Sequence, residues 1–234
     1  MAATWKDKGQ KLVYNVFNPF IQLLIKLGIT PNMITLLGLV INGVAAVVLI
    51  YGAENSDRSD HGCLAWAGFV ILLGGLMDMI DGRLARVTNS SSDYGALFDS
   101  VLDRYSEMVM FLGICYYLIS HDYFYSSLFA FIAMIGSVMV SYTRARAEGL
   151  GVNASVGIMQ RPERVIIIGV SAWACGLFSN SFGGDFKIEA HMLPIPLFET
   201  ITIFTFPIFI LAIMANITAI RRLIFAKNAI ANKN

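Results

Sequence analysis

The stretch that decides the fold, residues 78–103, reads DMIDGRLARVTNSSSDYGALFDSVLD and carries two pairs of carboxylates, Asp78 with Asp81 and Asp99 with Asp103. The members of the first pair are three residues apart and those of the second are four apart, so on a helix each pair shares one face. Two helices that each offer a pair of acids can enclose divalent cations, which offset the repulsion between the acids and the cost of placing them near lipid. Oxygen-only ligation of this kind suits Mg²⁺ or Mn²⁺. The stretch therefore predicts a site for two such ions.

The composition around this stretch is that of a membrane protein. The 234 residues are 56% hydrophobic and 14% charged, whereas soluble domains carry about 25% charged residues. A net charge of +1 argues against nucleic acid as a partner.

Hydrophobic segments of nearly the length of a membrane span recur along the chain, since a helix needs about 20 apolar residues to cross a bilayer. Residues 5–27 instead alternate apolar positions with lysines, which is typical of a helix that lies in the membrane interface. The sequence thus predicts an all-α polytopic membrane protein with one domain over residues 1–234: an N-terminal interfacial amphipathic helix at 1–28 and a six-helix catalytic core at 30–222. The six predicted spans are Met33–Tyr51, Cys63–Ile80, Gly95–Ile119, Tyr123–Tyr142, Val165–Asn180 and Leu197–Ile220.

The distribution of basic residues predicts the orientation of these spans. With both termini in the cytoplasm, Arg58 and Lys187 are the only Lys or Arg residues in outer loops, as the positive-inside rule requires. The acid cluster then faces the cytoplasm. We therefore predict a multi-pass protein of the cell (inner) membrane with a cytoplasmic active site.

Buried ion pairing is the alternative explanation of the acids. Asp103 and Arg104 are the obvious candidates, but adjacent residues of a helix point apart, so this pair is poor. Two hard cations held by shared carboxylates can neutralise a diphosphate and assist in-line displacement at phosphorus. One acid of such a site can also accept a proton from an attacking hydroxyl.

The pattern DxxDGxxARx8GxxxDxxxD, which starts at Asp78 and ends at Asp103, matches at eight fixed positions the signature of the CDP-alcohol phosphotransferase family. The chain resembles this family over nearly its whole length. The resemblance implies a homodimer in which a hydroxyl attacks the β-phosphorus of a CDP-linked lipid, such as CDP-diacylglycerol, and CMP leaves.

The resemblance also implies roles for individual residues. Asp78, Asp81 and Asp99 would bind the first metal, and Asp78, Asp99 and Asp103 the second, with Asp103 as the catalytic proton acceptor. The positions implied to contact the CDP-lipid are Asn32, Met33, Ile34, Thr35, Gly82, Arg86 and Ser92. For residues 32–35 a plain helix start is the alternative, because Pro31 favours the first turn of a helix.

A second cluster bears on the acceptor alcohol. The segments SYTRARAEGLG (141–151) and QRPERVI (160–166), together with Arg221 and Arg222, gather arginines beyond what the orientation of the spans requires. A phosphate on the acceptor explains them, although interfacial anchoring to lipid headgroups is the alternative. SYxRARAE with RPER resembles the phosphatidylinositol phosphate synthases, and this likeness implies an inositol phosphate site at Ser141, Arg144, Arg161, Arg164 and Arg222.

Several alternatives remain open at this level. The same chemistry could serve glycerol 3-phosphate, free inositol or serine. An intramembrane prenyltransferase also binds diphosphate through Mg²⁺ and aspartates, but its two acidic motifs lie far apart in sequence. A cation transporter can carry intramembrane acids as well, yet Gly82 and Arg86 beside the acids, and their clustering on one side of the membrane, argue against it.

Overall fold

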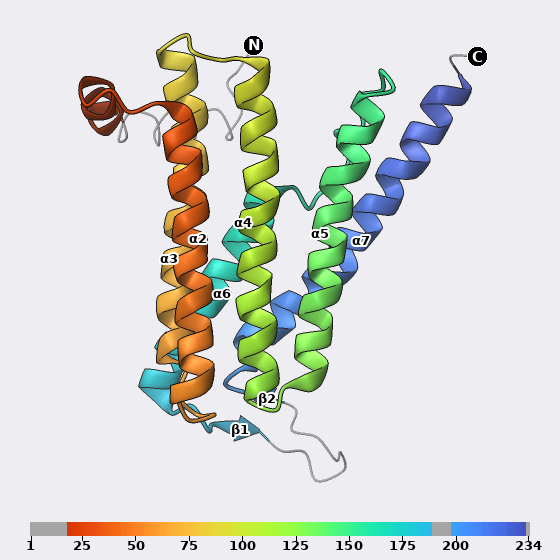
Figure 1. Ribbon diagram of the computed structural model, residues 1–234. Helices are drawn as coiled ribbons and strands as arrows, with labels where there is room; N and C mark the ends of the chain where they lie inside the picture. Colours follow the sequence, from red (N-terminus) through yellow and green to blue (C-terminus); the bar gives the residue numbers. More distant parts are fainter. Residues whose placement is uncertain (1–17, 189–197, 233–234) are drawn as a thin grey trace, which may run out of the picture.

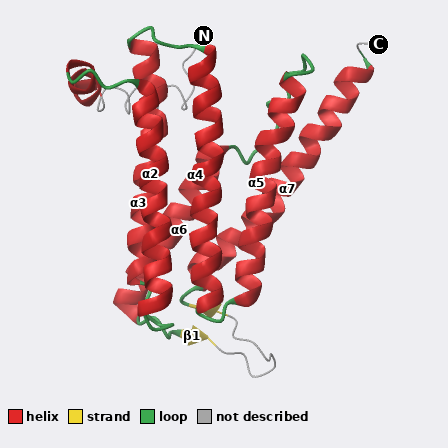
Figure 2. Cartoon of the chain, viewed as in Figure 1, coloured by secondary structure: helices red, strands yellow, loops and turns green. Residues whose placement is uncertain are grey.

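A computed structural model describes residues 18–188 and 198–232, and the described chain is almost entirely helical (Figure 2). The long helices are α2 (Pro31–Asn55), α3 (Gly62–Val87), α4 (Asp93–Ser120), α5 (Phe124–Glu148), α6 (Arg161–Phe182) and α7 (Thr202–Ala231). Strands β1 (Lys187–Ile188) and β2 (Phe198–Glu199) pair antiparallel, with Lys187 opposite Glu199. The all-α prediction is thus confirmed apart from this short hairpin.

The helices α2, α3, α5, α6 and α7 are long and apolar enough to cross a membrane, which makes the chain a multi-pass membrane protein. Helix α4 differs because its first half carries Asp99, Asp103, Arg104 and Glu107. The sixth span therefore stays a prediction.

Successive helices alternate in direction, so the α3–α4 turn and the carboxyl ends of α5 and α7 lie at one end of the bundle, with the β hairpin at the other (Figure 1). Helix α2 packs on α3 and α4, α3 on α6, α4 on α5, and α5 on α7. The neighbours approach closely at small residues: a Cβ on Gly68 would lie 2.6 Å from the backbone nitrogen of Trp173, and one on Gly113 would lie 2.7 Å from Cα of Ala46. One apolar core joins all six helices, and its large buried members include Leu49, Ile71, Phe111, Tyr117, Ile168, Phe204 and Leu211.

Local sequence explains where the helices begin. Pro31 and Pro162 occupy the first turns of α2 and α6, where a missing N–H costs nothing. Ser92 caps α4: its hydroxyl accepts a hydrogen bond from the Gly95 nitrogen at 3.0 Å. Asn89, with φ of 50°, turns the chain tightly between α3 and α4. This turn sets the two acid-bearing helices side by side.

Several helices run beyond the predicted spans. Helix α3 continues to Val87, α5 to Glu148 and α7 to Ala231, and α6 already begins at Arg161. Arg144, Arg161 and Arg222 are consequently helical residues with fixed directions, rather than parts of flexible loops.

The amino-terminal region is described only from residue 18. Residues 18–26 form a helix that crosses the end of α2 at a steep angle (Figure 1). Its Ile21 and Leu24 are buried against Ile34, Ile80 and Leu84, whereas Leu23 and Leu27 are exposed. The earlier part of the predicted interfacial helix lies outside the described residues, so that element stays a prediction.

Candidate active site

Two of the four acids come from the end of α3 and two from the beginning of α4. The Thr35 hydroxyl of α2 donates a hydrogen bond to Oδ2 of the buried Asp81 at 2.9 Å, and so fixes the direction of this carboxylate. A carboxylate oriented in this way presents its other oxygen to a ligand. This hydrogen bond links α2 to the acid cluster.

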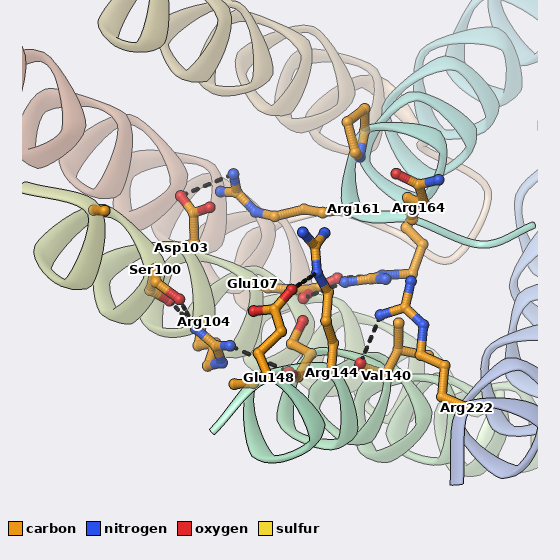
Figure 3. Close-up of a pocket in the computed structure, with 15 residues that line it drawn as sticks. Ser100, Asp103, Arg104, Glu107, Val140, Arg144, Glu148, Arg161, Arg164 and Arg222 are labelled. Carbon is orange, nitrogen blue, oxygen red and sulfur yellow. Dashed lines mark hydrogen bonds and ion pairs between the residues drawn. The ribbon is translucent and has the colours of Figure 1, made fainter. Parts of the chain in front are cut away.

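Arg161, at the start of α6, reaches between the two acid-bearing helices. Its Nη1 forms ion pairs with Oδ2 of Asp78 on α3 and, at 2.8 Å, with Oδ1 of Asp103 on α4 (Figure 3 shows the pair with Asp103). In the described part of the chain, no three His, Cys, Asp or Glu side chains are grouped closely enough to hold a metal ion by themselves. Asp78 of α3 and Asp103 of α4 instead share one positive partner, the guanidinium of Arg161.

A cavity of about 210 Å³ opens beside Asp81 and Asp99, between the ends of α2 and α3 and the start of α4. It brings together four of the predicted CDP-lipid contacts, namely Asn32, Thr35, Gly82 and Ser92. No atom of a neighbouring described residue lies within 4 Å of the place where a Cβ on Gly82 would point, so this face of α3 is open to a ligand.

The other three predicted contacts lie elsewhere. Met33 is exposed, and Ile34 is buried in the apolar cluster with Leu84. Arg86 is exposed and its Nε donates to the Gly82 carbonyl at 2.9 Å. Of residues 32–35, the 210 Å³ cavity is therefore lined by Asn32 and Thr35. These two are three positions apart and share one face of α2, as the helical repeat requires.

A second cavity, of about 440 Å³, lies between α4, α5, α6 and α7 (Figure 3). All five predicted acceptor residues line this cavity, namely Ser141, Arg144, Arg161, Arg164 and Arg222. Asp103 lines it as well. These residues are separated by up to 81 positions in the sequence, so the tertiary fold alone brings them together.

The arginines of this cavity differ in what already occupies their donors. Arg144 is exposed, and its one ion pair with a described residue is to Glu148, one turn along α5, at 2.8 Å. Arg222 donates to the carbonyls of Val156 and Val140, each at 2.8 Å, which ties α7 to α5 and to the loop before α6. Arg144 is the guanidinium with the most accessible position.

The guanidinium of Arg164 is buried and is bonded to groups of the protein interior. Its Nε and Nη2 pair with the two carboxylate oxygens of Glu107 at 2.7 and 2.9 Å, and Nη1 donates to the Met159 carbonyl at 3.0 Å. The side chains of Arg164 and Glu107 are 0% and 2% exposed. Arg164 thus borders the cavity while it anchors α6 to α4.

Sequence reasoning missed several polar and charged residues of this cavity, among them Glu107 and Arg104. Glu107 lies one helical turn after Asp103 and therefore on the same face, a signal that could have found it. Arg104 donates to the hydroxyl of Ser100 at 2.5 Å and to the Ser141 carbonyl at 3.4 Å, which joins α4 to α5.

A third, largely apolar cavity of about 430 Å³ runs between α3 and α6. Its walls are Leu72, Leu76, Met79, Val165 and Ile166, and its polar end is formed by Asp78, Asp99, Asp103 and Arg161. The acids join the cavities: Asp99 lines both this one and the 210 Å³ cavity, and Asp103 lines both this one and the 440 Å³ cavity.

The donor set of the acid cluster fits a hard divalent cation. It offers carboxylate oxygens from two facing helices, and a positive group, the Arg161 guanidinium, already lies between two of them. Hard cations such as Mg²⁺ and Mn²⁺ prefer such oxygen ligands. Asp78, Asp81, Asp99 and Asp103 are the residues that would hold them.

Three cavities, one largely apolar and one rich in arginines, border the four aspartates inside a helical bundle, and this arrangement agrees with what the motif implies. The chain belongs to the CDP-alcohol phosphatidyltransferase family, whose model matches residues 28–227. It is accordingly a membrane-embedded transferase of phospholipid biosynthesis, and the predicted family membership is confirmed.

The chain is similar to two synthases whose names refer to inositol phosphate lipids. The chain is 30% identical over 190 residues to the phosphatidylinositol phosphate synthase of Mycobacteroides abscessus, covering 80% of each chain. It is 36% identical over 151 residues to the archaetidylinositol phosphate synthase of Pyrococcus horikoshii, covering 64% of this chain and 72% of the relative.

Solved structures agree with this placement. The structure of Mycobacterium tuberculosis phosphatidylinositol phosphate synthase with CDP-DAG bound superposes with a TM-score of 0.70 at 26% identity, covering 91% of this chain and 94% of that one. The same protein in complex with manganese and citrate also gives a TM-score of 0.70, at 26% identity, covering 89% and 87%.

Proposed function

We propose that this protein transfers the phosphatidyl group of CDP-diacylglycerol to a hydroxyl of myo-inositol 1-phosphate, giving phosphatidylinositol phosphate and CMP. The observation that carries the proposal is that three chemically distinct cavities border one cluster of four acids: Asp81 and Asp99 line the first, Asp103 the second, and Asp78, Asp99 and Asp103 the third. The named relatives support the choice of acceptor, since inositol phosphate lipids are the products in their names.

The CDP-lipid would occupy two of the cavities. The cytidine and its phosphates fit the 210 Å³ cavity beside Asn32, Thr35, Gly82 and Ser92. The glycerol and acyl chains fit the cavity between α3 and α6, whose walls are mostly apolar side chains. The diphosphate would then lie at Asp99, the acid that borders both cavities. Met33, Ile34 and Arg86 stay predicted contacts at the edge of this site.

The acceptor phosphate would bind in the 440 Å³ cavity. Arg144 and Ser141 offer donors at its accessible side, and Arg161 and Arg222 add positive charge. A guanidinium binds phosphate through paired, charge-assisted hydrogen bonds. Arg164, held by Glu107, would contribute its charge to the field of the cavity.

Asp103 lies where the acceptor cavity meets the lipid cavity, which suits the role of general base. It would take the proton of the acceptor hydroxyl as the hydroxyl oxygen forms a bond to the β-phosphorus. The bond from the β-phosphorus to the bridging oxygen breaks, and CMP leaves with that electron pair. Two Mg²⁺ or Mn²⁺ ions, when bound by the four acids, would neutralise the diphosphate and the leaving CMP.

The arrangement of charges supports a cytoplasmic site in the cell membrane. The basic residues gather at the end of the bundle that carries the acids, in keeping with the positive-inside rule. We also propose that the chain works as a homodimer, as the family resemblance implies.

The proposal is tested with purified protein in detergent, CDP-diacylglycerol, Mg²⁺ and a panel of alcohols, with CMP release as the readout. We expect CMP with inositol phosphate and none with glycerol 3-phosphate, free inositol or serine. Release with glycerol 3-phosphate alone would assign the runner-up acceptor, and no CMP with any alcohol would refute the reaction.

A paired substitution tests the acceptor site. Arg144→Ala should raise the KM for the acceptor more than the KM for the CDP-lipid. Arg146→Ala is the matched control, because Arg146 is an exposed arginine on the same helix and does not line the cavity. An equal rise of both KM values in Arg144→Ala would contradict the assignment.

A further inference from the structure

Arg161 stands at the border between the acid cluster and the acceptor cavity. It lines both the 440 Å³ cavity and the apolar cavity, as do its neighbours Asp103 and Pro162. Its guanidinium spans from α6 to Asp78 on α3 and Asp103 on α4. One side chain therefore separates two spaces that the proposed reaction has to connect.

The contacts of Arg161 are strong but incomplete. Nη1 carries both ion pairs, and the side chain is only 18% exposed, so the charges are poorly screened by water. Its Nε is buried and has no hydrogen-bond partner among the described residues. A buried donor without a partner costs about 1–3 kcal/mol. The two acids thus hold the guanidinium in a position that leaves one of its own donors unsatisfied.

The same two acids belong to the set that would bind the divalent cations. A guanidinium and a divalent cation cannot share these oxygens, because like charges a few ångströms apart repel each other strongly in a partly buried site. When Asp78 and Asp103 bind a cation, Arg161 loses both of its partners. Of the two cavities that Arg161 lines, one is largely apolar, so the charged side chain moves into the polar acceptor cavity.

We propose that Arg161 is an internal counter-ion of the acid cluster that metal binding displaces into the acceptor cavity, where it becomes a phosphate ligand. This inference rests on the proposed function for its last step. It makes Arg161 a positioning residue that couples the two sites: the acceptor phosphate finds its full set of donors only after the acids are occupied by cations. Acceptor binding before metal binding is disfavoured, which keeps the general base Asp103 covered until the site is loaded.

The first test measures metal binding alone, with no substrate. Mn²⁺ binding to the metal-free, full-length protein in detergent is followed by electron paramagnetic resonance. Arg161→Ala should bind Mn²⁺ about tenfold more tightly or better, since the ion no longer displaces an ion pair. Arg221→Ala is the matched control, because Arg221 is an exposed arginine at the same end of the bundle that does not line the acceptor cavity, and it should change the affinity less than about twofold.

Thermal unfolding adds a readout that distinguishes a counter-ion from a mere cavity-lining residue. Without metal, Arg161→Ala should unfold at a lower temperature than the wild type, because its acids are left without a positive partner. Saturating Mn²⁺ should abolish the difference. Equal Mn²⁺ affinity in the two proteins, or a loss of stability that Mn²⁺ does not restore, would overturn the proposal.

The coupling can also be measured in the wild-type chain, which keeps the test valid if the variant does not fold. By thermodynamic reciprocity, Mn²⁺ should tighten the binding of inositol phosphate by the same factor by which inositol phosphate tightens Mn²⁺. Titration calorimetry, corrected for association of Mn²⁺ with phosphate in buffer, measures both factors. Independent binding of the two would refute the coupling. Tighter Mn²⁺ binding in Arg161→Ala without any binding of inositol phosphate would retain the counter-ion and reject only the acceptor.

Discussion

The buried pair of Glu107 and Arg164 offers the sharpest prediction about stability. The pair is bidentate, with N–O distances of 2.7 and 2.9 Å, and its side chains are 2% and 0% exposed. Glu107→Ala removes the carboxylate and leaves the guanidinium with the Met159 carbonyl as its one hydrogen-bond acceptor among the described residues. Breaking a buried pair by removing one partner costs about 3–5 kcal/mol. For a chain of 234 residues, this cost lowers the unfolding midpoint by roughly 6–20 °C.

The assay is thermal unfolding of the purified protein in detergent, compared with two control proteins. Glu148→Ala breaks an exposed pair on α5, whose side chains are 47% and 46% exposed, and should cost less than about 1 kcal/mol. The double variant Glu107→Leu with Arg164→Met replaces the pair by apolar side chains and should recover most of the lost stability.

One outcome would refute the reasoning. If Glu107→Ala unfolds at the same temperature as Glu148→Ala, the Glu107–Arg164 pair does not anchor α6 to α4, and Arg164 has to be free to take part in acceptor binding. Acceptor KM values for the double variant then decide between an anchoring role and a binding role.

Three further predictions concern the site and the opposite end of the bundle, which carries β1 and β2. Asp103→Asn should lower the rate of CMP release by about 10²–10⁴-fold with CDP-lipid binding retained, and an active variant would exclude Asp103 as the base. Thr35→Val removes the hydrogen bond to Asp81 and should weaken Mn²⁺ binding by about tenfold or more, as loss of a residue that orients a metal ligand does; unchanged Mn²⁺ affinity would count against this support. At the end of the bundle that carries β1 and β2, burial lowers the pKa of His61 from its ordinary value of 6.5, with a smaller contribution from His121. The folded protein therefore keeps His61 neutral, and its contribution to stability is present above pH 6.5 and is lost as the pH falls below that value. The unfolding midpoint should fall less between pH 7.5 and 5 in His61→Gln than in the wild type, and parallel curves would contradict this assignment.

Much of the fold follows from local properties of the sequence. Apolar segments of membrane length predict the helices, Pro31 and Ser92 mark where two of them begin, and the scarcity of charge predicts the membrane. The helix ends were less predictable, because a helix in the bundle continues past the apolar segment wherever its polar residues pack against neighbours. Arg161 and Arg222 lie on helices for this reason.

The sequence alone determined the family. Four aspartates at helical spacing, with Gly82, Arg86 and Gly95 between them, were enough to identify it, since spacing along a helix is a local property.

Only the tertiary structure decided which partner each charged group meets. The match of Glu107 with Arg164, and the position of Arg161 between Asp78 and Asp103, join helices that are distant in the sequence. No local pattern encodes these pairs, because they depend on how α6 crosses α3 and approaches α4. The same packing gives these arginines different surroundings, although in the sequence they look alike: Arg164 is buried with Glu107, Arg161 lies between Asp78 and Asp103, and Arg144 is exposed.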